Sequence, residues 1–180
     1  MGLDSSFCLV FPRRAIDIVL DAFSKHVATA DREKLQSLPK RCCLNMLFPQ
    51  DGEVMGYLDL QESPCSKEGN FLSVGCVWTT IYAGSELACL WSAAATTDMS
   101  LLFNESDAVK NTWLNIAETS AALALFLDID HTSWNMLHPR KVWVERPSME
   151  DYGWPLDDIP ADVDKYLFEA LEKAGIAGAI

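Results

Sequence analysis

The segment from Phe71 to Asp128 constrains the fold most, because it is the longest run that can form a core without help from elsewhere. It opens with a period-two alternation whose mostly apolar members are Leu72, Val74, Cys76, Trp78, Thr80 and Tyr82. Successive side chains on a strand face opposite sides of a sheet, so the pattern predicts a strand with one apolar face. The glycine-containing turn 83–85 then predicts a hairpin to a second, weaker strand over 87–94.

Two more elements complete this segment. The run from Met99 to Phe103 predicts a continuation of the strand or a new one. Asn104 predicts the start of a long helix, because its side-chain oxygen can accept hydrogen bonds from the free N–H groups of the first turn. Steps of three and four residues place one mostly apolar face on that helix: Val109, Trp113, Ile116, Ser120, Leu123 and Leu127.

The rest of the chain adds strands and helices on both sides. Pro12 suits the first position of a helix, where its missing N–H costs nothing, and Pro49 to Gly52 has the composition of a tight turn. The other predicted elements are strands over 6–11, 42–48, 53–60 and 141–144, a short helix over 31–38, a loop over 61–70, and a terminal helix over 161–174 closed by Gly175.

These elements predict an α+β fold, with a mostly antiparallel sheet and helices packed on one face. The strand that ends at Phe11 and enters a helix is echoed by the run that ends at Phe103 and enters a helix. The echo suggests two ferredoxin-like (split β-α-β) halves, 5–61 and 71–146, followed by an acidic aromatic segment, 147–180. We expect a single domain over 1–180, because the strands on either side of the loop need each other to form a sheet of ordinary width.

The chain is strongly acidic, with 26 Asp and Glu residues against 14 Lys and Arg residues and a formal net charge of −12. This balance argues against nucleic acid as a partner, because phosphate binding needs clustered Lys and Arg. An acidic surface suits solubility, a basic protein partner or cation binding. The sequence has no apolar run of 18 residues, so we expect no membrane span.

The acidity is concentrated near the C-terminus, where residues 145–172 hold nine acidic residues against Arg146 and Lys165. Aromatic side chains interleave with these acids, as in a recognition surface where Trp and Tyr anchor the contact and carboxylates steer a basic partner. The candidate contact residues are Tyr152, Trp154, Asp157 and Asp158. The alternative is a tail whose aromatic side chains pack back on the sheet while its acids stay in water.

A second candidate site follows the predicted long helix, where Asp128, Asp130, His131 and His138 form a local group with metal-ligand chemistry. Two carboxylates and two imidazoles can hold a divalent cation and activate its water, which would make the protein a metal-assisted hydrolase. The spacing matches no strong signature, and a helix end followed by an Asp-rich turn explains the same residues without chemistry. We expect no cofactor.

The six cysteines contain no C-x-x-C pair, and the adjacent Cys42 and Cys43 have poor geometry for a shared tetrahedral metal site. Cys8, Cys43, Cys76 and Cys89 lie in apolar strand contexts, where a free cysteine behaves as a small hydrophobe. The N-terminus lacks a basic region followed by an apolar stretch and a cleavage site. We therefore expect reduced, buried thiols in a cytoplasmic protein.

These observations leave three functional hypotheses. The first is a small acidic intracellular protein-binding module, such as an inhibitor or immunity-type protein that covers a basic enzyme surface. The others are the metal-assisted hydrolase and a small-molecule-binding or scaffold domain, whose apolar pocket between sheet and helices would use the Trp residues. The protein is similar in general character to bacterial toxin-immunity proteins, a similarity of bulk properties and not of motif. Acidity and the C-terminal segment favour the binding hypothesis, and no catalytic motif favours an enzyme.

Overall fold

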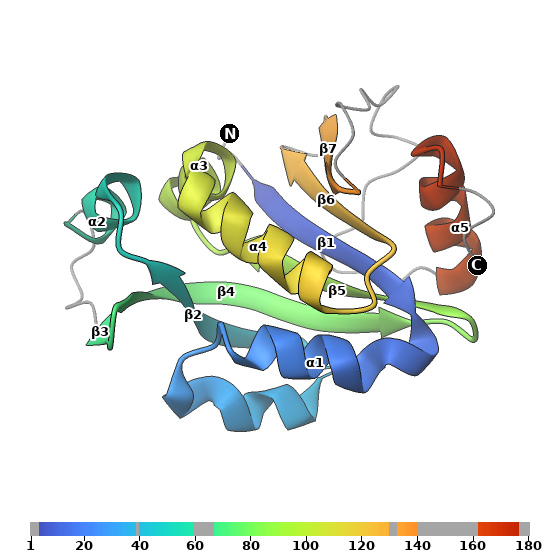
Figure 1. Cartoon of the computed structure of the whole chain (residues 1–180), viewed down its shortest axis with the longest axis horizontal. Coiled ribbons are helices and arrows are strands. Elements are labelled where there is room, and N and C mark those ends of the chain that lie inside the picture. Colours follow the sequence, from blue (N-terminus) through green and yellow to red (C-terminus); the bar gives the residue numbers. More distant parts are fainter. Residues whose placement is uncertain (1–3, 39, 60–66, 130–132, 140–161, 177–180) are drawn as a thin grey trace.

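A computed structural model of the chain describes residues 4–38, 40–59, 67–129, 133–139 and 162–176 (Figure 1). Its strands are β1 (Ser5–Pro12), β2 (Cys42–Pro49), β3 (Lys67–Glu68), β4 (Phe71–Ala83), β5 (Leu87–Ala94), β6 (Ala124–Ile129) and β7 (Ser133–His138). Its helices are η1 (Arg13–Ala15), α1 (Ile16–Ser24), η2 (Thr29–Ser37), α2 (Gly52–Asp59), α3 (Thr97–Glu105), α4 (Asp107–Thr119) and α5 (Val163–Lys173). The strands form one antiparallel sheet, so the predicted α+β class is confirmed.

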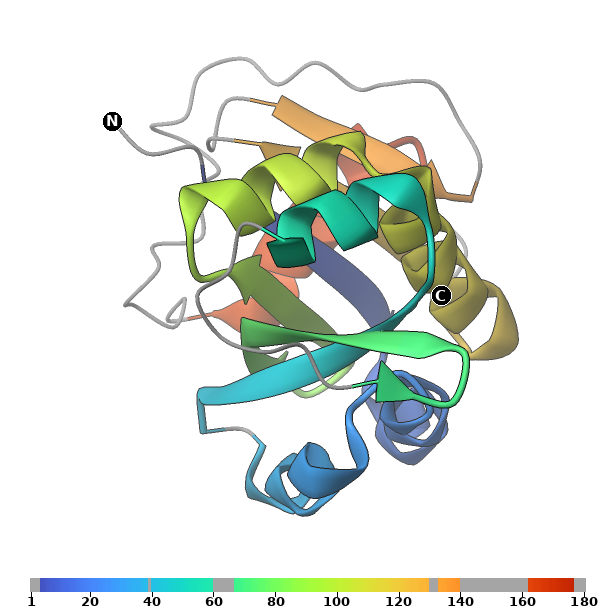
Figure 2. The ribbon, with the colours of Figure 1, turned by 90° about the vertical axis from the view of Figure 1, so that its left-hand side faces the viewer.

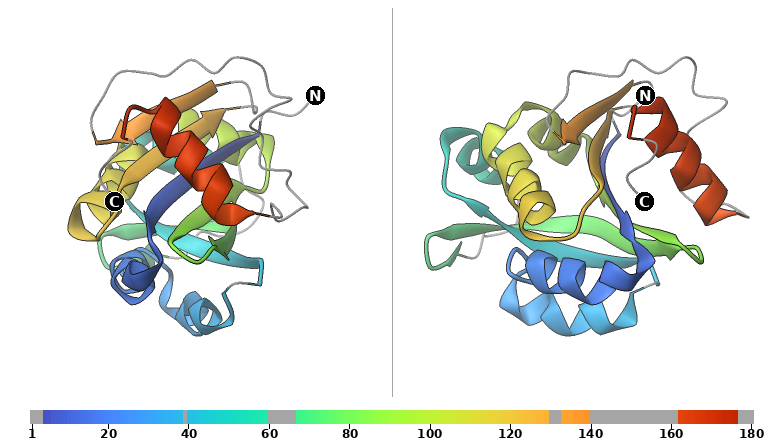
Figure 3. Two further views of the ribbon diagram at one scale, coloured as in Figure 1. Left: turned by 90° about the vertical axis from the view of Figure 1, so that its right-hand side faces the viewer. Right: turned by 45° about the vertical axis from the view of Figure 1, so that its right-hand side comes forward.

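The sheet carries helices on both faces, with α1, α3 and α4 on one side and α5 on the other (Figures 1 and 3). Alternation along the central strand β1 explains this arrangement, because Phe7, Leu9 and Phe11 pack in the core under the first group of helices. Cys8 and Val10 point the other way, into a second core with α5. The sequence predicted helices on one face; α5 adds a second layer, since the sheet has an apolar surface on each side.

The core between the sheet and α4 contains a cluster of aromatic rings in contact with one another. The ring of Phe7 lies 4.9 Å from that of Trp113 and 5.1 Å from that of Phe103, and Phe23 lies 5.6 Å from Trp113. Trp113 is fully buried, and Trp91 is buried in the core under α5. These two tryptophans therefore serve packing, and the space beside Trp113 is occupied by side chains.

The strand order β2-β4-β5-β1-β6-β7 interleaves the two predicted halves, because β1 of the first half lies between β5 and β6 of the second. The connection from β5 through α3 and α4 to β6 has the split β-α-β form, with β1 inserted between two parallel strands. The connection from β1 to β2 lacks it, since β5 and β4 lie between those strands. A pair of ferredoxin-like halves is thus not confirmed, and the single domain over 1–180 stays a prediction.

The segment Glu53 to Leu60, predicted as a strand, begins as the helix α2. Asp51 caps this helix, because its Oδ1 atom accepts a hydrogen bond of 2.7 Å from the backbone N–H of Val54. The turn composition before it therefore marks a helix start and not a hairpin. Figure 2 shows α2 beside α3 at this end of the molecule, where the Ser106 hydroxyl donates to the Asp51 carboxylate at 3.4 Å.

The run from Met99 to Phe103, predicted as a strand, lies in α3. Thr96 caps α3 by accepting from the N–H of Met99 at 3.3 Å, and Ser106 caps α4 by accepting from the N–H of Val109 at 3.3 Å. The long helix expected from Asn104 therefore begins three residues later.

That helix also ends earlier than expected, at Thr119, and the apolar run that follows forms the strand β6. Leu125 and Leu127 face one core, and Ala124 and Phe126 face the other. A strand buried on both faces has no polar side, so its sequence resembles that of a buried helix. The predicted strand over 141–144 lies outside the described residues, and β7 was not predicted.

The first strand of the opening segment, β4, contains a bulge that shifts its alternation. Leu44 of β2 pairs with Val77, whereas Met46 pairs with Val74, so β4 has one more residue than β2 between these pairs. The extra residue lies at Gly75–Cys76. The residues of β4 that face the first core therefore have even numbers before the bulge and odd numbers after it. They are Leu72, Val74, Val77 and Ile81.

The predicted single apolar face of β4 is consequently wrong beyond Val74. Trp78 and Tyr82 belong to the side of the sheet that α5 covers. There the guanidinium of Arg41 lies 4.8 Å from the centre of the Trp78 ring, a cation–π contact that covers the indole.

The cap of α2 can be tested by substitution. We expect Asp51→Ala to lower the free energy of unfolding by about 1 kcal/mol, because it removes the acceptor for the Val54 N–H. Asp51→Asn keeps a capping oxygen and should retain most of the stability. Urea unfolding of the three proteins measures the difference, and an equal loss in both variants would contradict the role of Asp51 as a cap.

Candidate functional site

The C-terminal helix α5 is fixed to the β4–β5 hairpin by one carboxylate. Asp164, in the first turn of α5, accepts hydrogen bonds from the Ser85 N–H and hydroxyl at 2.6 Å each and from the Leu87 N–H at 2.8 Å. The Glu86 N–H donates to it at 3.1 Å. Three consecutive backbone N–H groups that converge on one anion form a backbone nest. We call this contact the Asp164 latch.

The Asp164 latch requires a residue without a side chain at position 84. A Cβ atom at this position would lie 2.2 Å from the Oδ1 atom of Asp164, which is far inside van der Waals contact. The other side of the turn is held by Arg13, whose backbone N–H donates to the Glu86 carbonyl at 2.8 Å and whose guanidinium donates to the Gly84 carbonyl. The turn is therefore fixed from both ends of the chain.

The hydrogen bonds also set the charge state of the latch. Partial burial favours the neutral form of Asp164, but the hydrogen bonds from Ser85, Glu86 and Leu87 outweigh burial and lower its pKa to about 2. The carboxylate is thus ionised at neutral pH.

The helix that the latch holds is amphipathic. Its buried face consists of Val163, Leu167, Ala170 and Leu171, which contact β5 and β4 and share one core with side chains of β1, β6 and β7. Its outer face exposes Phe168, with 39% of the residue accessible to solvent, beside the exposed acid Glu172 one turn later. Helix α5, whose place on the sheet is shown in Figure 3, therefore presents an aromatic ring between the exposed Lys165 one turn before it and the exposed Glu172 one turn after it.

The predicted contact residues Tyr152, Trp154, Asp157 and Asp158 lie outside the described residues. Of the predicted acidic aromatic segment 147–180, the structure describes 162–176, which contains all of α5. Phe168 was not among the residues predicted for the contact, and it lies within the predicted terminal helix over 161–174.

The predicted metal ligands are only partly described, and Asp130 and His131 lie outside the described residues. Asp128 is buried on β6 and pairs with Trp134, whereas His138 pairs with Leu125. Their positions differ by three residues in the register, which is roughly 10 Å along the strand. Within the described ranges, no group of three His, Cys, Asp or Glu residues could hold a metal ion. The metal site stays a prediction.

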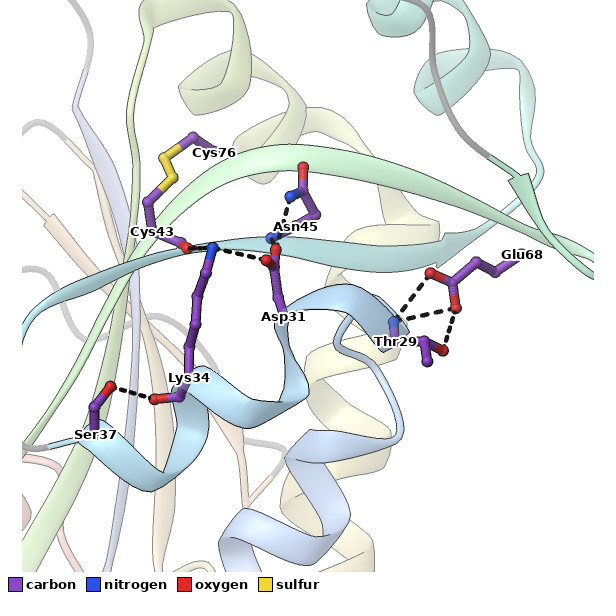
Figure 4. A network of polar contacts seen from close by, with 8 residues as sticks. All are labelled: Thr29, Asp31, Lys34, Ser37, Cys43, Asn45, Glu68 and Cys76. Carbon is purple, nitrogen blue, oxygen red and sulfur yellow. Dashed lines mark hydrogen bonds and ion pairs between the residues drawn. A yellow bond between two sulfur atoms is a disulfide. The ribbon is translucent and has the colours of Figure 1, made fainter.

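A second polar centre covers the outer edge of β2 (Figure 4). Asp31 of η2 is only 5% exposed, and its Oδ2 atom accepts from the Asn45 N–H and from the Asn45 side-chain amide, both at 2.7 Å. Its Oδ1 atom pairs with the Lys34 ammonium at 2.7 Å, and Lys34 also donates to the Cys43 carbonyl at 3.1 Å. Burial would raise the pKa of Asp31, but these donors lower it overall.

Backbone hydrogen bonds extend these contacts along β2. The Ala28 N–H donates to the Asn45 carbonyl and the Leu47 N–H donates to the His26 carbonyl, each at 2.8 Å. Residues 26–34 thus satisfy the backbone groups of an edge strand that would otherwise be open to pairing with another chain. We call residues 26–34 the β2 cover.

The structure corrects the expectation that all cysteines are reduced. Cys43 of β2 and Cys76 of β4 form a disulfide, with their Cα atoms 5.5 Å apart. Cys8, Cys42 and Cys89 are free thiols, and Cys8 and Cys89 are buried as predicted. The pairing was not predictable from spacing, because the sequence does not show how β2 is aligned with β4. In the observed register Cys43 pairs with Trp78, and Cys76 lies in the bulge two residues along β4.

No protein-family model, curated protein or solved structure matches the chain. Among the helices that the structure describes, none is long and apolar enough to cross a membrane.

The Asp164 latch should make stability depend on acidity. The pKa of Asp164 is lower in the folded chain than its ordinary value of 3.8, so its contribution is complete above about pH 5 and disappears as the pH falls through 4 to about 2. Because the group is solvent-accessible, we expect Asp164→Asn to cost only about 1 kcal/mol at pH 7. Urea unfolding of both proteins should show this difference vanish near pH 2. Glu172→Gln, on the same helix, serves as the control and should show no such difference.

Gly84 offers an independent test through a double-mutant cycle. Gly84→Ala should destabilise the protein by about 1–3 kcal/mol, because the added methyl group displaces the Asp164 carboxylate. In an Asp164→Ala background the obstacle is absent, so the same substitution should cost much less. Additive effects of the two substitutions in urea unfolding would contradict the close contact.

Proposed function

We propose that the protein is a protein-binding module that engages a basic protein partner through its acidic C-terminal part, as an inhibitor or immunity-type protein would. The observation that carries this proposal is the exposure of Phe168 beside the acid Glu172 on α5, a helix held by the Asp164 latch and by a buried apolar face. A large aromatic side chain on a rigid element is a typical interface anchor, because little conformational entropy is lost when a partner covers it.

The distribution of charge supports the same surface. Seven of the 14 Lys and Arg residues lie between Arg13 and Arg41, together with four acidic residues, so this stretch has a net positive charge. It forms η1, α1 and η2, and α1 and η2 occupy the lower side of Figure 1. The bases lie in η1, in η2 and after each helix, whereas α1 itself contains Asp17 and Asp21. The acidic excess therefore falls on the rest of the chain, which includes α5 and the segment before it.

Tyr152, Trp154, Asp157 and Asp158 belong to the same proposal, since they precede α5 in the chain and extend its combination of acids and aromatic rings. We propose the cytoplasm as the compartment of this function. There the Cys43–Cys76 disulfide would meet reducing thiols.

The proposal can be tested by affinity capture from an extract of the native cells, followed by measurement of the dissociation constant with the purified partner. Phe168→Ala should weaken binding about tenfold or more, as expected for an aromatic anchor. A triple variant, Trp154→Ala, Asp157→Ala and Asp158→Ala, should weaken it further. Raising the salt concentration should also reduce the affinity, because the charges involved are exposed.

Ile18→Ala is the matched control, since Ile18 is an exposed apolar residue on α1, with 54% of the residue accessible, outside the C-terminal part of the chain. It should leave binding unchanged. A partner that is acidic, or an equal loss of affinity in Ile18→Ala and Phe168→Ala, would contradict the proposed surface.

A further inference from the structure

The Cys43–Cys76 disulfide joins the edge strand β2 to β4 at the bulge. It closes a loop with a sequence separation of 33, which contains α2 and β3. Both cysteines are half-buried, so a small reductant can approach the sulfur atoms more readily than in the core. The disulfide therefore lies at an accessible margin of the sheet.

The disulfide is continuous with the β2 cover (Figure 4). The carbonyl of Cys43 accepts from Lys34, and two residues later both the backbone and the side chain of Asn45 donate to Asp31. The Asn45 side chain also lies directly against the bulge, since a Cβ atom on Gly75 would be 1.9 Å from its Oδ1 atom. Asn45 thus contacts both the bulge that contains Cys76 and Asp31 of η2, so it links the position of Cys76 to that of η2.

The neighbouring Cys42 does not make this pair a catalytic dithiol. Adjacent residues of a strand point to opposite faces, and Cys42 packs against the first core. Burial raises the pKa of the Cys42 thiol, which leaves little of the reactive thiolate. The Cys43–Cys76 disulfide is therefore suited to a switch between an oxidised and a reduced state, and not to repeated catalysis of thiol–disulfide exchange.

We propose that Cys43–Cys76 is a redox-responsive staple, which keeps the β2 cover seated on the edge of β2 and releases it on reduction. A dithiol reductant breaks the S–S bond, becomes a cyclic disulfide itself, and leaves its two protons on the Cys43 and Cys76 sulfur atoms. Without the cross-link the β2 edge opens more often, and the backbone groups of Asn45 and Leu47 become accessible to another strand.

Hydrogen exchange read by mass spectrometry tests the proposal on the full chain. Protein treated with oxidised glutathione should yield a peptide pair linked through Cys43 and Cys76. Treatment with dithiothreitol should add two titratable thiols at this pair and accelerate exchange at Asn45 and Leu47 about tenfold, because these amides donate to the cover. Exchange in β1 and β5 should stay unchanged, which shows that the fold is intact.

Two variants separate the staple from other effects of reductant. Cys43→Ser/Cys76→Ser should exchange like the reduced protein and should not respond to dithiothreitol. Cys42→Ser should respond like the wild type. Absence of the linked peptide pair, equal exchange at Asn45 and Leu47 in the two redox states, or a response that persists in the double variant would each overturn the proposal.

Discussion

The burial of β1 on both faces is the constraint on which the rest of the structure depends. Phe7, Leu9 and Phe11 need cover from α1, α3 and α4, whereas Cys8 and Val10 need cover from α5. Apolar area left in water would cost about 25 cal/mol for each Å². A single helical layer cannot satisfy a strand of this kind. The acidic C-terminal helix is therefore part of the fold, and its outer face has a fixed position on the molecule.

The sequence was sufficient for elements whose alternation or capping is local, and insufficient where two structures share one pattern. The strands β1, β2, β4 and β5 and the terminal helix were all predicted close to their observed bounds. Glu53 to Leu60 and Met99 to Phe103 are short apolar runs, for which periodicity does not separate helix from strand. Their caps, Asp51 and Thr96, settle the question only when the hydrogen bonds are seen.

The candidate site divides in the same way. Its acidity could be read from composition, because charge on a surface needs no knowledge of contacts. The contacts that fix it could not, since Asp164 and Ser85 are 79 residues apart and Cys43 and Cys76 are 33 apart. A carboxylate among many others gives no local sign that three backbone N–H groups will converge on it. Phe168 was missed for a related reason, because its exposure depends on which face of α5 the latch turns outward.

The bulge in β4 has a consequence for how this chain can change in length. It sets the phase of everything from Val77 to the hairpin, so that Trp78 and Tyr82 serve one layer while Val77 and Ile81 serve the other. Deleting one residue at Gly75–Cys76 would restore regular pairing with β2 but would exchange the two sets of side chains between the layers. A descendant sequence that loses the bulge must therefore replace the side chains of the second half of β4 at the same time. The number of residues at Gly75–Cys76 is consequently hard to change.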